Sequence, residues 1–352
     1  MKLIEKMRVA IVKCYKSNRS KMDCTDRVLK FFGKQMKIFS YLILFLFGLN
    51  SFLLASEYID DKYPQSELYN KPVEVIPNVF TAIGATAPPT YENAGHNNNL
   101  SFVVTNEGVV VINSGASVRL AEALHSEIMK ITDKPVKLVI NENGQGHAIL
   151  GNKYWSQKGI DILAHEDAIF EIEENSHSIL QRMKSYNKDR AVGTEVVVPN
   201  KSFSEKFIFT LGGLEFHVLH LGPAHGPGDT QVWLPELSLM IAGDMAFHER
   251  MLPIFENTCT KCWLETWDEK FAPLNALYVI PGHGHPTNMA QVTRFTRDYL
   301  VDLRKKISEV LENGGDLAEA FYVDQQRWRL LDTFDELAKR NAGRVFEEME
   351  FE

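Results

Sequence analysis

The sequence predicts an α/β fold of the α+β layered kind, over about residues 74–290, followed by a helical C-terminal extension over 291–352. Two observations predict this class. Short apolar segments bounded by Gly and Asn are typical of strands, and they alternate with segments whose apolar residues recur every three or four positions, as in helices. Such alternation is typical of sheets covered by helices. The 352 residues, 45% of them hydrophobic, suffice for one large domain with a packed core.

The predicted elements of the domain follow from these patterns in order. Leu120, Leu124 and Ile128 share one face of the first predicted helix. A hairpin is expected to turn at Gly212 and Gly213. The elements are strands 79–84, 100–105 and 108–113, helix 118–131, strands 136–140 and 159–165, helix 166–183, hairpins 206–222 and 231–244, and a final strand within 274–286.

The C-terminal extension is predicted to contain two helices docked on the domain. The first is one long amphipathic helix that ends at the sequence NGGD, and the second covers 332–351. The apolar face of the first helix contains Val292, Phe295, Tyr299, Leu303, Ile307 and Val310.

The N-terminal part differs from the rest of the chain. Residues 36–55 have the plan of a secretory signal peptide: a basic start, an apolar centre and a small-residue cleavage site near Ala55. We therefore expect residues 1–35 to be a mis-assigned upstream extension, and the protein to be periplasmic. The alternative is a membrane anchor, for which this apolar run is short. A membrane association is expected only through an uncleaved leader.

Charge restricts the partners of the exported chain. From residue 56 onward, 27 Lys and Arg face 43 Asp and Glu, a formal charge of −16. Such a surface repels phosphate backbones, so we expect no nucleic acid partner and a small-molecule substrate instead.

Two cysteines, Cys259 and Cys262, lie beyond the leader, in the sequence CTKC. In an oxidising compartment such a pair most often closes a small disulfide, which is our prediction. A redox-active pair or a metal clip are the alternatives.

Ligand-type side chains follow three of the predicted strands. Imidazole and carboxylate groups suit zinc and, less selectively, iron or manganese. Glycines beside them let the backbone turn so that these groups can converge. Glu249 and Arg250, in the same region, are interpreted as a solvated pair. The ligand-type residues are His225, Asp229, Asp244, His248, His283 and His285.

The segments GHNNNLSFVVTNEGVVVINSG, AHGPGDT, IAGD and PGHG, in this order, resemble the metallo-β-lactamase superfamily over 74–290. The resemblance implies an αββα sandwich with a metal site at one edge, between the two sheets. It implies that His225 is the family's third histidine ligand, Asp244 its metal-bridging aspartate and His283 its last histidine ligand. The C-terminal tail is similar to periplasmic members associated with sulfur oxidation and quinoprotein systems, which implies a periplasmic redox-system partner.

The sequence departs from this family at its first motif, H-x-H-x-D-H. With Gly151 and Asn152 as the reference, Asn143 and Gln145 replace the first two histidines, and His147 takes the place of the aspartate. A shift of one residue would instead make His147 the final histidine of the motif. Asn113 also stands where many members have an aspartate.

These residues predict a mononuclear metal site with fewer ligands than the family's site. It would hold about one zinc, with iron or manganese as alternatives. His147, His225, Asp244 and His283 are the predicted ligands, and Asp244 and His147 the predicted catalytic residues; His147 would either bind the metal or orient water. Residues expected around them are Asn143, Gln145, Asp229, His248 and His285.

The predicted function is a metal-dependent hydrolase in which activated water attacks an ester, amide, lactone or thioester carbonyl. The alternative is a non-catalytic binding or accessory protein of a periplasmic redox system. The sequence offers no choice of substrate within this class.

Overall fold

The computed structural model describes residues 67–352, which belong to a compact unit that spans Asp61–Glu352. The predicted upstream extension and signal peptide lie outside the described residues, so they remain predictions. Within the described residues, no helix is long and apolar enough to cross a membrane.

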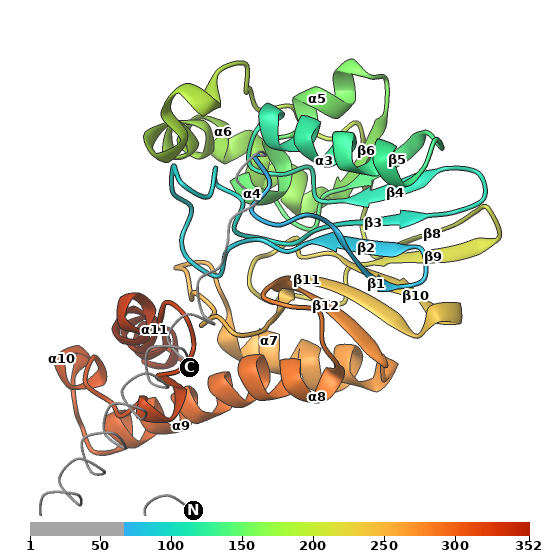
Figure 1. Ribbon diagram of the computed structural model, residues 1–352. Helices are drawn as coiled ribbons and strands as arrows, with labels where there is room; N and C mark the ends of the chain where they lie inside the picture. Colours follow the sequence, from blue (N-terminus) through green and yellow to red (C-terminus); the bar gives the residue numbers. More distant parts are fainter. Residues whose placement is uncertain (1–66) are drawn as a thin grey trace, which may run out of the picture. The chain divides into compact units, whose positions relative to one another are not determined.

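Two sheets form the centre of the molecule (Figure 1). In the first sheet β1 to β4 are antiparallel and β4 to β7 are parallel. Its strands, in spatial order, are β1 (Val73–Ile76), β2 (Val79–Ala82), β3 (Leu100–Val104), β4 (Val109–Ile112), β5 (Val136–Ile140), β6 (Asp161–His165) and β7 (Lys201–Phe203).

The second sheet is built from the two predicted hairpins and the last strand. Only β11 and β12 pair in parallel, and the other neighbours are antiparallel. Its spatial order is β12 (Tyr278–His283), β11 (Leu239–Phe247), β10 (Gln231–Leu234), β9 (Leu214–Leu219) and β8 (Lys206–Leu211).

Helices cover the outer face of each sheet, which gives four layers (Figure 1). The helices on the side of the first sheet are α3 (Val118–Ile131), α4 (Gly146–Ile149), α5 (Asn152–Gln157) and α6 (Glu166–Asn187). Those on the side of the second sheet are α7 (Thr260–Thr266), α8 (Met289–Val292), α9 (Asp298–Glu312), α10 (Leu317–Ala320) and α11 (Phe334–Met349). Short π segments are η3 (Trp267–Phe271) and η5 (Thr293–Arg297), and 3₁₀ turns are η1 (Lys188–Ala191), η2 (Pro235–Leu237), η4 (Ala272–Leu274) and η6 (Gln326–Trp328).

Alternation along β4 shows how the layers are held together. Val109 and Val111 pack with α3, whereas Val110 and Ile112 pack against the second sheet. Successive side chains of a strand point to opposite faces, so a strand buried on both faces is apolar throughout. The predicted layered fold is confirmed as an αββα sandwich with C-terminal helices.

The C-terminal helices share a core with the second sheet. Tyr299, Leu303 and Ile307 of α9 are buried in the same cluster as Met240 of β11 and Val345 of α11. The long helix predicted from residue 292 runs from α8 through η5 into α9, with a π turn near its start. The extension therefore packs on the sandwich as a continuous part of its core.

Two strands were not predicted from the sequence. β1 has exposed and half-buried residues at the edge of the first sheet, and β7 is only three residues long. Neither has a buried apolar run or a clear alternation, which are the signals that predict strands.

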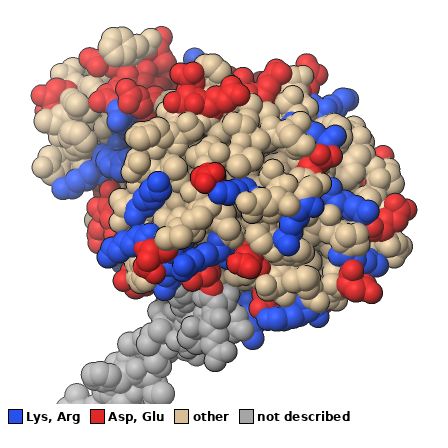
Figure 2. Space-filling view, turned by 90° about the horizontal axis from the view of Figure 1, so that it is seen from above, with Lys and Arg blue, Asp and Glu red and all other residues tan. Residues whose placement is uncertain are grey.

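Both kinds of charged side chain lie on the face seen from above (Figure 2). Asp and Glu gather along its upper edge, whereas Lys and Arg are more frequent in the lower half of the view, among further Asp and Glu.

Candidate metal centre

The ends of three strands bring the candidate ligands together. Asp244 lies near the end of β11, His283 is the last residue of β12, and His147 follows β5 in α4. The parallel pairing of β11 with β12 places Phe247 opposite His283. The residues thus meet at one edge of the sandwich, between the two sheets.

Glycine is required beside Asp244. A Cβ at position 282 would lie 2.3 Å from Asp244 Oδ1, and a Cβ at position 243 would lie 2.2 Å from Glu142 Oε2. Gly243 also has a φ of 56°, which favours glycine. These two glycines let the carboxylates approach the ends of β11 and β12.

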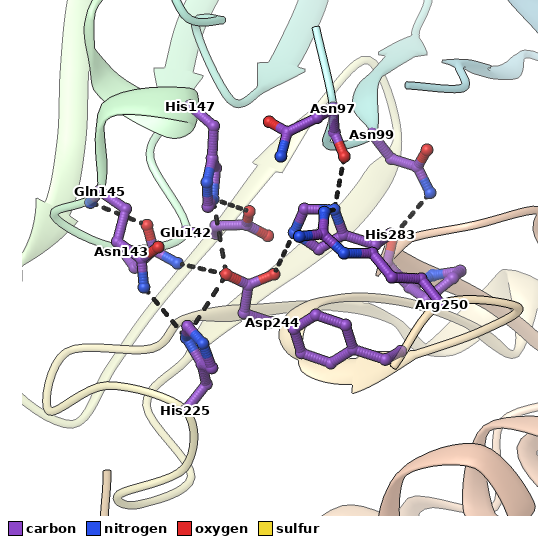
Figure 3. A network of polar contacts seen from close by, with 12 residues as sticks. Asn97, Asn99, Glu142, Asn143, Gln145, His147, His225, Asp244, Arg250 and His283 are labelled. Atoms are coloured by element: carbon purple, nitrogen blue, oxygen red, sulfur yellow. Dashed lines mark hydrogen bonds and ion pairs between the residues drawn. The ribbon is translucent and has the colours of Figure 1, made fainter. Parts of the chain in front are cut away.

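Asp244 is the centre of the group (Figure 3). Its Oδ1 lies 3.3 Å from His283 Nε2, and its Oδ2 lies 3.5 Å from His147 Nε2. One ligand atom from each of these three residues lies within 4.8 Å of the other two. This is a spacing that one ion can bridge.

His225 lies at the border of this group. Its Nδ1 is 3.6 Å from Asp244 Oδ2, but Gln145 Nε2 lies 3.0 Å from the same nitrogen. Its Nε2 is buried and has no hydrogen-bond partner among the described residues. Three of the four predicted ligands therefore form a compact set, and the fourth is engaged by an amide.

Two groups contact Nδ1 of His283. Arg250 Nη1, at 3.1 Å, can only donate, whereas the carbonyl oxygen of Asn97 can only accept and therefore favours the tautomer of His283 that carries its hydrogen on Nδ1. Its Nε2 then presents a lone pair to Asp244 Oδ1, and two lone pairs repel unless a cation or a proton lies between them. A histidine that donates its other N–H to a carbonyl is the common arrangement of metal-ligating histidines.

The amides that replace two family histidines contact the ligands directly. Asn143 Nδ2 donates to Asp244 Oδ2 over 3.1 Å, and Gln145 reaches His225 (Figure 3). Asn143 Oδ1 in turn accepts from the Gln145 backbone N–H over 3.0 Å. Amides are not among the common zinc ligands. We therefore interpret both residues as groups that orient the side chains of the candidate ligands.

Glu142 belongs to the site but was not predicted from the sequence. It is buried, and its Oε1 lies 3.3 Å from His147 Nε2 without a hydrogen bond. Its backbone N–H donates to Asn113 Oδ1 over 3.1 Å. The sequence contains a feature that points to Glu142, because this carboxylate stands two positions after a buried apolar strand.

Burial sets the protonation states. It raises the pKa of Glu142 and of Asp229 well above their usual ranges, with the charge of Asp244 adding to the effect. Burial also lowers the pKa of His225 and of His283 to about 4, so both imidazoles are neutral at neutral pH. Neutral imidazole is the form that binds metal.

Asp244 is the ionised carboxylate of the site. Burial raises its pKa, but the neighbouring His283 and His147 lower it more, so the pKa lies well below its usual range. One carboxylate with neutral imidazoles around it forms an anionic centre of the type that attracts a divalent cation.

The interpretation of Arg250 as a solvated residue was wrong. Arg250 is 7% exposed, and its Nη1 lies 3.1 Å from His283 Nδ1. Burial lowers its pKa to about 10, so the guanidinium remains charged at neutral pH. Its neighbour Glu249 instead accepts from His285, over 2.6 Å. Sequence adjacency to Glu249 was a misleading signal, because the chain bends at Glu249, which has a φ of 63°, so that Glu249 is partly exposed and the next residue is buried.

His248 and His285 lie apart from the three compact ligands. His248 Nδ1 contacts the carbonyl oxygen of His285 at 2.9 Å, and His285 is exposed beside Glu249. Asp229 lies closer: it is buried, and its Oδ2 accepts from the Gly226 N–H over 2.6 Å, next to His225. Asp229 thus shapes the loop that carries His225.

A disulfide joins Cys259 and Cys262 at the start of α7, in a segment whose neighbouring residues contact His225. Thr258 donates to the carbonyl oxygen of His225 over 2.8 Å. The rings of Phe255 and Trp263 pack on the imidazole of His225. This segment supports His225 from the side of the second sheet.

A second group of ligand-type residues has a structural explanation. His165 and His220 stack at 4.0 Å, with Asp167 nearby. His165 caps α6: its Nδ1 accepts from the Asp167 N–H, and its Nε2 contacts the carbonyl oxygen of Ser204. With both nitrogens engaged, His165 is poorly suited to bind a metal.

The αββα sandwich and a His/Asp centre between the ends of its sheets define a class of metal-dependent hydrolase folds. A sequence model of the metallo-β-lactamase superfamily matches residues 94–283, and the chain belongs to this superfamily.

Individual relatives are distant. A linear primary-alkylsulfatase from Pseudomonas sp. (strain ATCC 19151) is 21% identical over 245 residues, which cover 59% of this chain and 46% of that protein. The chain thus spans about half the length of this curated relative.

Solved structures support the fold. The sec-alkylsulfatase Pisa1 from Pseudomonas sp. aligns with a TM-score of 0.60 and 16% identity, over 79% of this chain and 50% of that one. A metallo-beta-lactamase from Pontibacter korlensis aligns with a TM-score of 0.52 and 18% identity, over 63% of this chain and 94% of that one.

Proposed function

We propose that this protein is a metal-dependent hydrolase with a mononuclear site that has fewer ligands than the family's site. We propose zinc as its metal, with iron or manganese as alternatives. The observation that carries the proposal is the convergence of His147, Asp244 and His283, whose ligand atoms lie within 4.8 Å of one another. Asp244 Oδ1 and His147 Nε2 are buried without a hydrogen bond, as ligand atoms are when their partner is an ion.

These three residues would hold the ion, with His225 as a fourth ligand once it leaves Gln145. When bound, such an ion supplies Lewis acidity, which lowers the pKa of water to about 7 and polarises a carbonyl oxygen.

The chain's own residues supply the rest of the chemistry. Asn143 fixes the carboxylate of Asp244 through its amide. Burial raises the pKa of Glu142 and so favours the protonated carboxyl group beside His147 Nε2, which suits Glu142 to exchange a proton at this position. The substrate class is an ester, amide, lactone or thioester. Because two of the similar proteins are alkylsulfatases, alkyl sulfates belong in the substrate panel.

Metal content measured on protein purified without chelator, together with hydrolysis of this panel, tests the proposal. About one zinc per chain and turnover that EDTA abolishes are expected. Metal at full occupancy without turnover of any member of this panel would contradict the hydrolase function.

A second candidate is a non-catalytic binding protein, which one observation favours: Asn143 and Gln145 engage Asp244 and His225 in place of two ligands. The absence of bound metal under the same conditions would support it. Export to the periplasm and a redox-system partner there remain part of our proposal in both cases.

A further inference from the structure

Glu142 is a buried carboxylate at the edge of the candidate metal centre. It is 2% exposed, and its Oε1 has no hydrogen-bond partner among the described residues. The amides of Asn98 and Asn113 lie near its carboxyl group, but no lysine or arginine of residues 67–352 forms an ion pair with it. A buried carboxylate oxygen without a donor or a cation is costly, so its presence here points to a partner that binds it.

The position of Glu142 is fixed by both sheets. Its backbone N–H donates to Asn113 Oδ1, directly after β4, over 3.1 Å. Its carbonyl oxygen accepts from the backbone N–H of Thr230, which directly precedes β10, over 2.7 Å. Gly243 of β11 leaves room for the carboxyl group, since a Cβ there would lie 2.2 Å from Glu142 Oε2. The fold therefore holds this carboxylate against β11, next to Asp244.

The distances around His147 suit a shared ion (Figure 3). Its Nε2 lies 3.3 Å from Glu142 Oε1 and 3.5 Å from Asp244 Oδ2. Asp244 Oδ1 in turn lies 3.3 Å from His283 Nε2. Ligand atoms at about 2.0–2.1 Å from one tetrahedral zinc ion are about 3.3–3.4 Å apart. The separation of Glu142 from His147, and those of Asp244 from the two histidines, are close to this value.

A cation would also change the relation between Glu142 and Asp244. Burial and the charge of Asp244 raise the pKa of Glu142, which favours a proton on Glu142 in the metal-free centre. A divalent cation attracts both carboxylates, and this proton is released when Glu142 binds the ion. Proton exchange by Glu142 would then require its carboxylate to leave the ion.

We propose that Glu142 is a metal ligand, and that its carboxylate replaces an imidazole that the altered motif lacks. Glu142 directly precedes Asn143, which stands at the first histidine of that motif. The proposal deepens the proposed function and rests on it for the presence of a metal. The ion would then be held by two carboxylates and two imidazoles, those of Glu142, Asp244, His147 and His283.

Glu142 completes this set of four without His225. Gln145 Nε2 lies 3.0 Å from His225 Nδ1, and the two side chains can stay together. Glu142 is not one of the three residues whose ligand atoms all lie within 4.8 Å of one another, so its carboxyl group has to turn when the ion binds. The terminal torsion of a glutamate side chain is broad, which permits such a turn.

The affinity of the metal-free protein for Zn²⁺, measured in competition with a chromophoric chelator, tests the proposal. Glu142→Gln keeps the size of the side chain but removes a charged donor. It should weaken Zn²⁺ binding beyond the roughly 10- to 100-fold that is typical for the loss of a residue that only supports a ligand. His225→Ala should weaken it less than Glu142→Gln does.

Glu171→Gln is the matched control, because it removes a carboxylate near the centre without removing a proposed ligand. Glu171 is a half-buried residue of α6 whose charge acts on His147, and the two side chains form no ion pair with each other. Its loss should weaken Zn²⁺ binding less than about fivefold.

Co²⁺ in place of Zn²⁺ separates a ligand from a neighbour. The visible absorption of bound Co²⁺ depends on the number and kind of its ligands, so Glu142→Gln should change it and Glu171→Gln should not. An unchanged Co²⁺ spectrum in Glu142→Gln would overturn the proposal, whether its affinity is that of the wild type or weaker, because Glu142 would then act at most through its charge.

Melting temperatures show whether Glu142 has only a structural role. Metal-free Glu142→Gln should melt no lower than the metal-free wild type, because a neutral amide replaces a carboxyl group beside Asp244. With zinc the variant should melt lower than the wild type, because it binds the ion less tightly. An equal loss in both forms would indicate a structural role and overturn the proposal.

A second variant covers a failure of Glu142→Gln to fold. Glu142→Asp keeps the charge but draws the carboxylate back by one methylene group, so it should weaken Zn²⁺ binding and change the Co²⁺ spectrum. Wild-type affinity and spectrum in Glu142→Asp would contradict the ligand role.

The outcomes separate this inference from the proposed function. A wild-type protein that binds neither Zn²⁺ nor Co²⁺ contradicts both. Zinc binding that depends on Glu142, without turnover of any member of the substrate panel, contradicts only the hydrolase function. Zinc-dependent turnover with wild-type zinc affinity in Glu142→Gln contradicts only the role of Glu142.

Discussion

Asn143 donates its side-chain N–H to Asp244 Oδ2 over 3.1 Å, and both groups are buried. Where the superfamily motif has a histidine, this chain has an amide that contacts the remaining carboxylate. The residue that replaces the motif histidine therefore takes part in the hydrogen bonds of the site. Asn143 restrains Asp244 in the position from which its two oxygens reach His283 and His147.

Metal binding should depend unequally on the four predicted ligands. His283→Ala or Asp244→Ala removes a member of the compact set and should abolish stoichiometric zinc binding. His225→Ala should weaken it less, because Gln145 already engages that imidazole. Metal analysis gives the stoichiometry, and the melting temperature should fall with it, because a ligand that binds only the folded state stabilises that state. The control is His248→Ala, which should keep its zinc. Equal zinc content in all four variants would disprove the assignment.

Gly282 should be intolerant of any side chain. Gly282→Ala places a Cβ 2.3 Å from Asp244 Oδ1 and within 3 Å of the β11 backbone, so that Asp244 must move. We expect a loss of about 2–4 kcal/mol in the free energy of unfolding, as for an overpacked core, together with loss of metal. Gly226→Ala is the matched control, since its Cβ would meet nothing nearer than 3.7 Å. Chemical denaturation and metal analysis measure both effects, and an unchanged Gly282→Ala protein would contradict the structure of this edge.

The fold was predictable because its signals are local. The apolar run at 136–140 and the helix face through Leu120 and Leu124 depend on the alternation of neighbouring residues. The site was predictable only where a family motif marked the residues, as for His225 and His283. Glu142 was overlooked although its place after a buried strand marked it, whereas Arg250 was missed because its burial is decided by the pairing of distant strands. Nothing in the sequence near Arg250 shows that its side chain lies against His283.

The predicted leader can be tested on exported protein. If residues 36–55 are a cleaved signal peptide, protein isolated from the periplasm should begin at Ser56 or Glu57. N-terminal sequencing or intact mass gives the answer. A chain that keeps Met1 would refute both the cleavage and the assignment of residues 1–35 as an upstream extension.

The Cys259–Cys262 disulfide should have a modest effect on stability. The closed loop is short, so the double variant Cys259→Ser/Cys262→Ser should lose less than the roughly 3 kcal/mol expected for a 15-residue loop. Thiol titration of the unfolded, unreduced protein should find no free thiol in the exported chain. Two free thiols would argue against the disulfide, and loss of zinc in the double variant would move these cysteines into the metal site.

Asn341 should be the most sensitive polar residue that joins the C-terminal extension to the cavity of about 930 Å³ that His147, Asp244 and His283 line. It is fully buried in α11; its Nδ2 donates to the carbonyl oxygen of Leu252 over 2.7 Å, and its Oδ1 accepts from the Ile254 N–H over 3.0 Å. Pro253, between these two partners, lines the cavity.

Asn341→Ala would leave both backbone groups buried without a partner, at a cost of about 2–4 kcal/mol in the free energy of unfolding. Asn341→Asp keeps the acceptor for the Ile254 N–H but loses the donor to Leu252 and to Tyr299 Oη, and it buries a carboxylate, so it should destabilise the protein as well. Asn313→Ala is the control, because that asparagine is exposed and bonds only within its own turn at 2.7 Å; it should change stability by less than about 0.5 kcal/mol. Denaturation curves give the energies, and the zinc content of the folded variants shows whether a change in the loop at Pro253 reaches the candidate metal centre. If Asn341→Ala proves as stable as Asn313→Ala, this residue does not hold the extension to the loop at Pro253. The attachment would then depend on the apolar packing of α9 and α11 and on other polar contacts, such as those of Glu348 with Thr260 and Lys261.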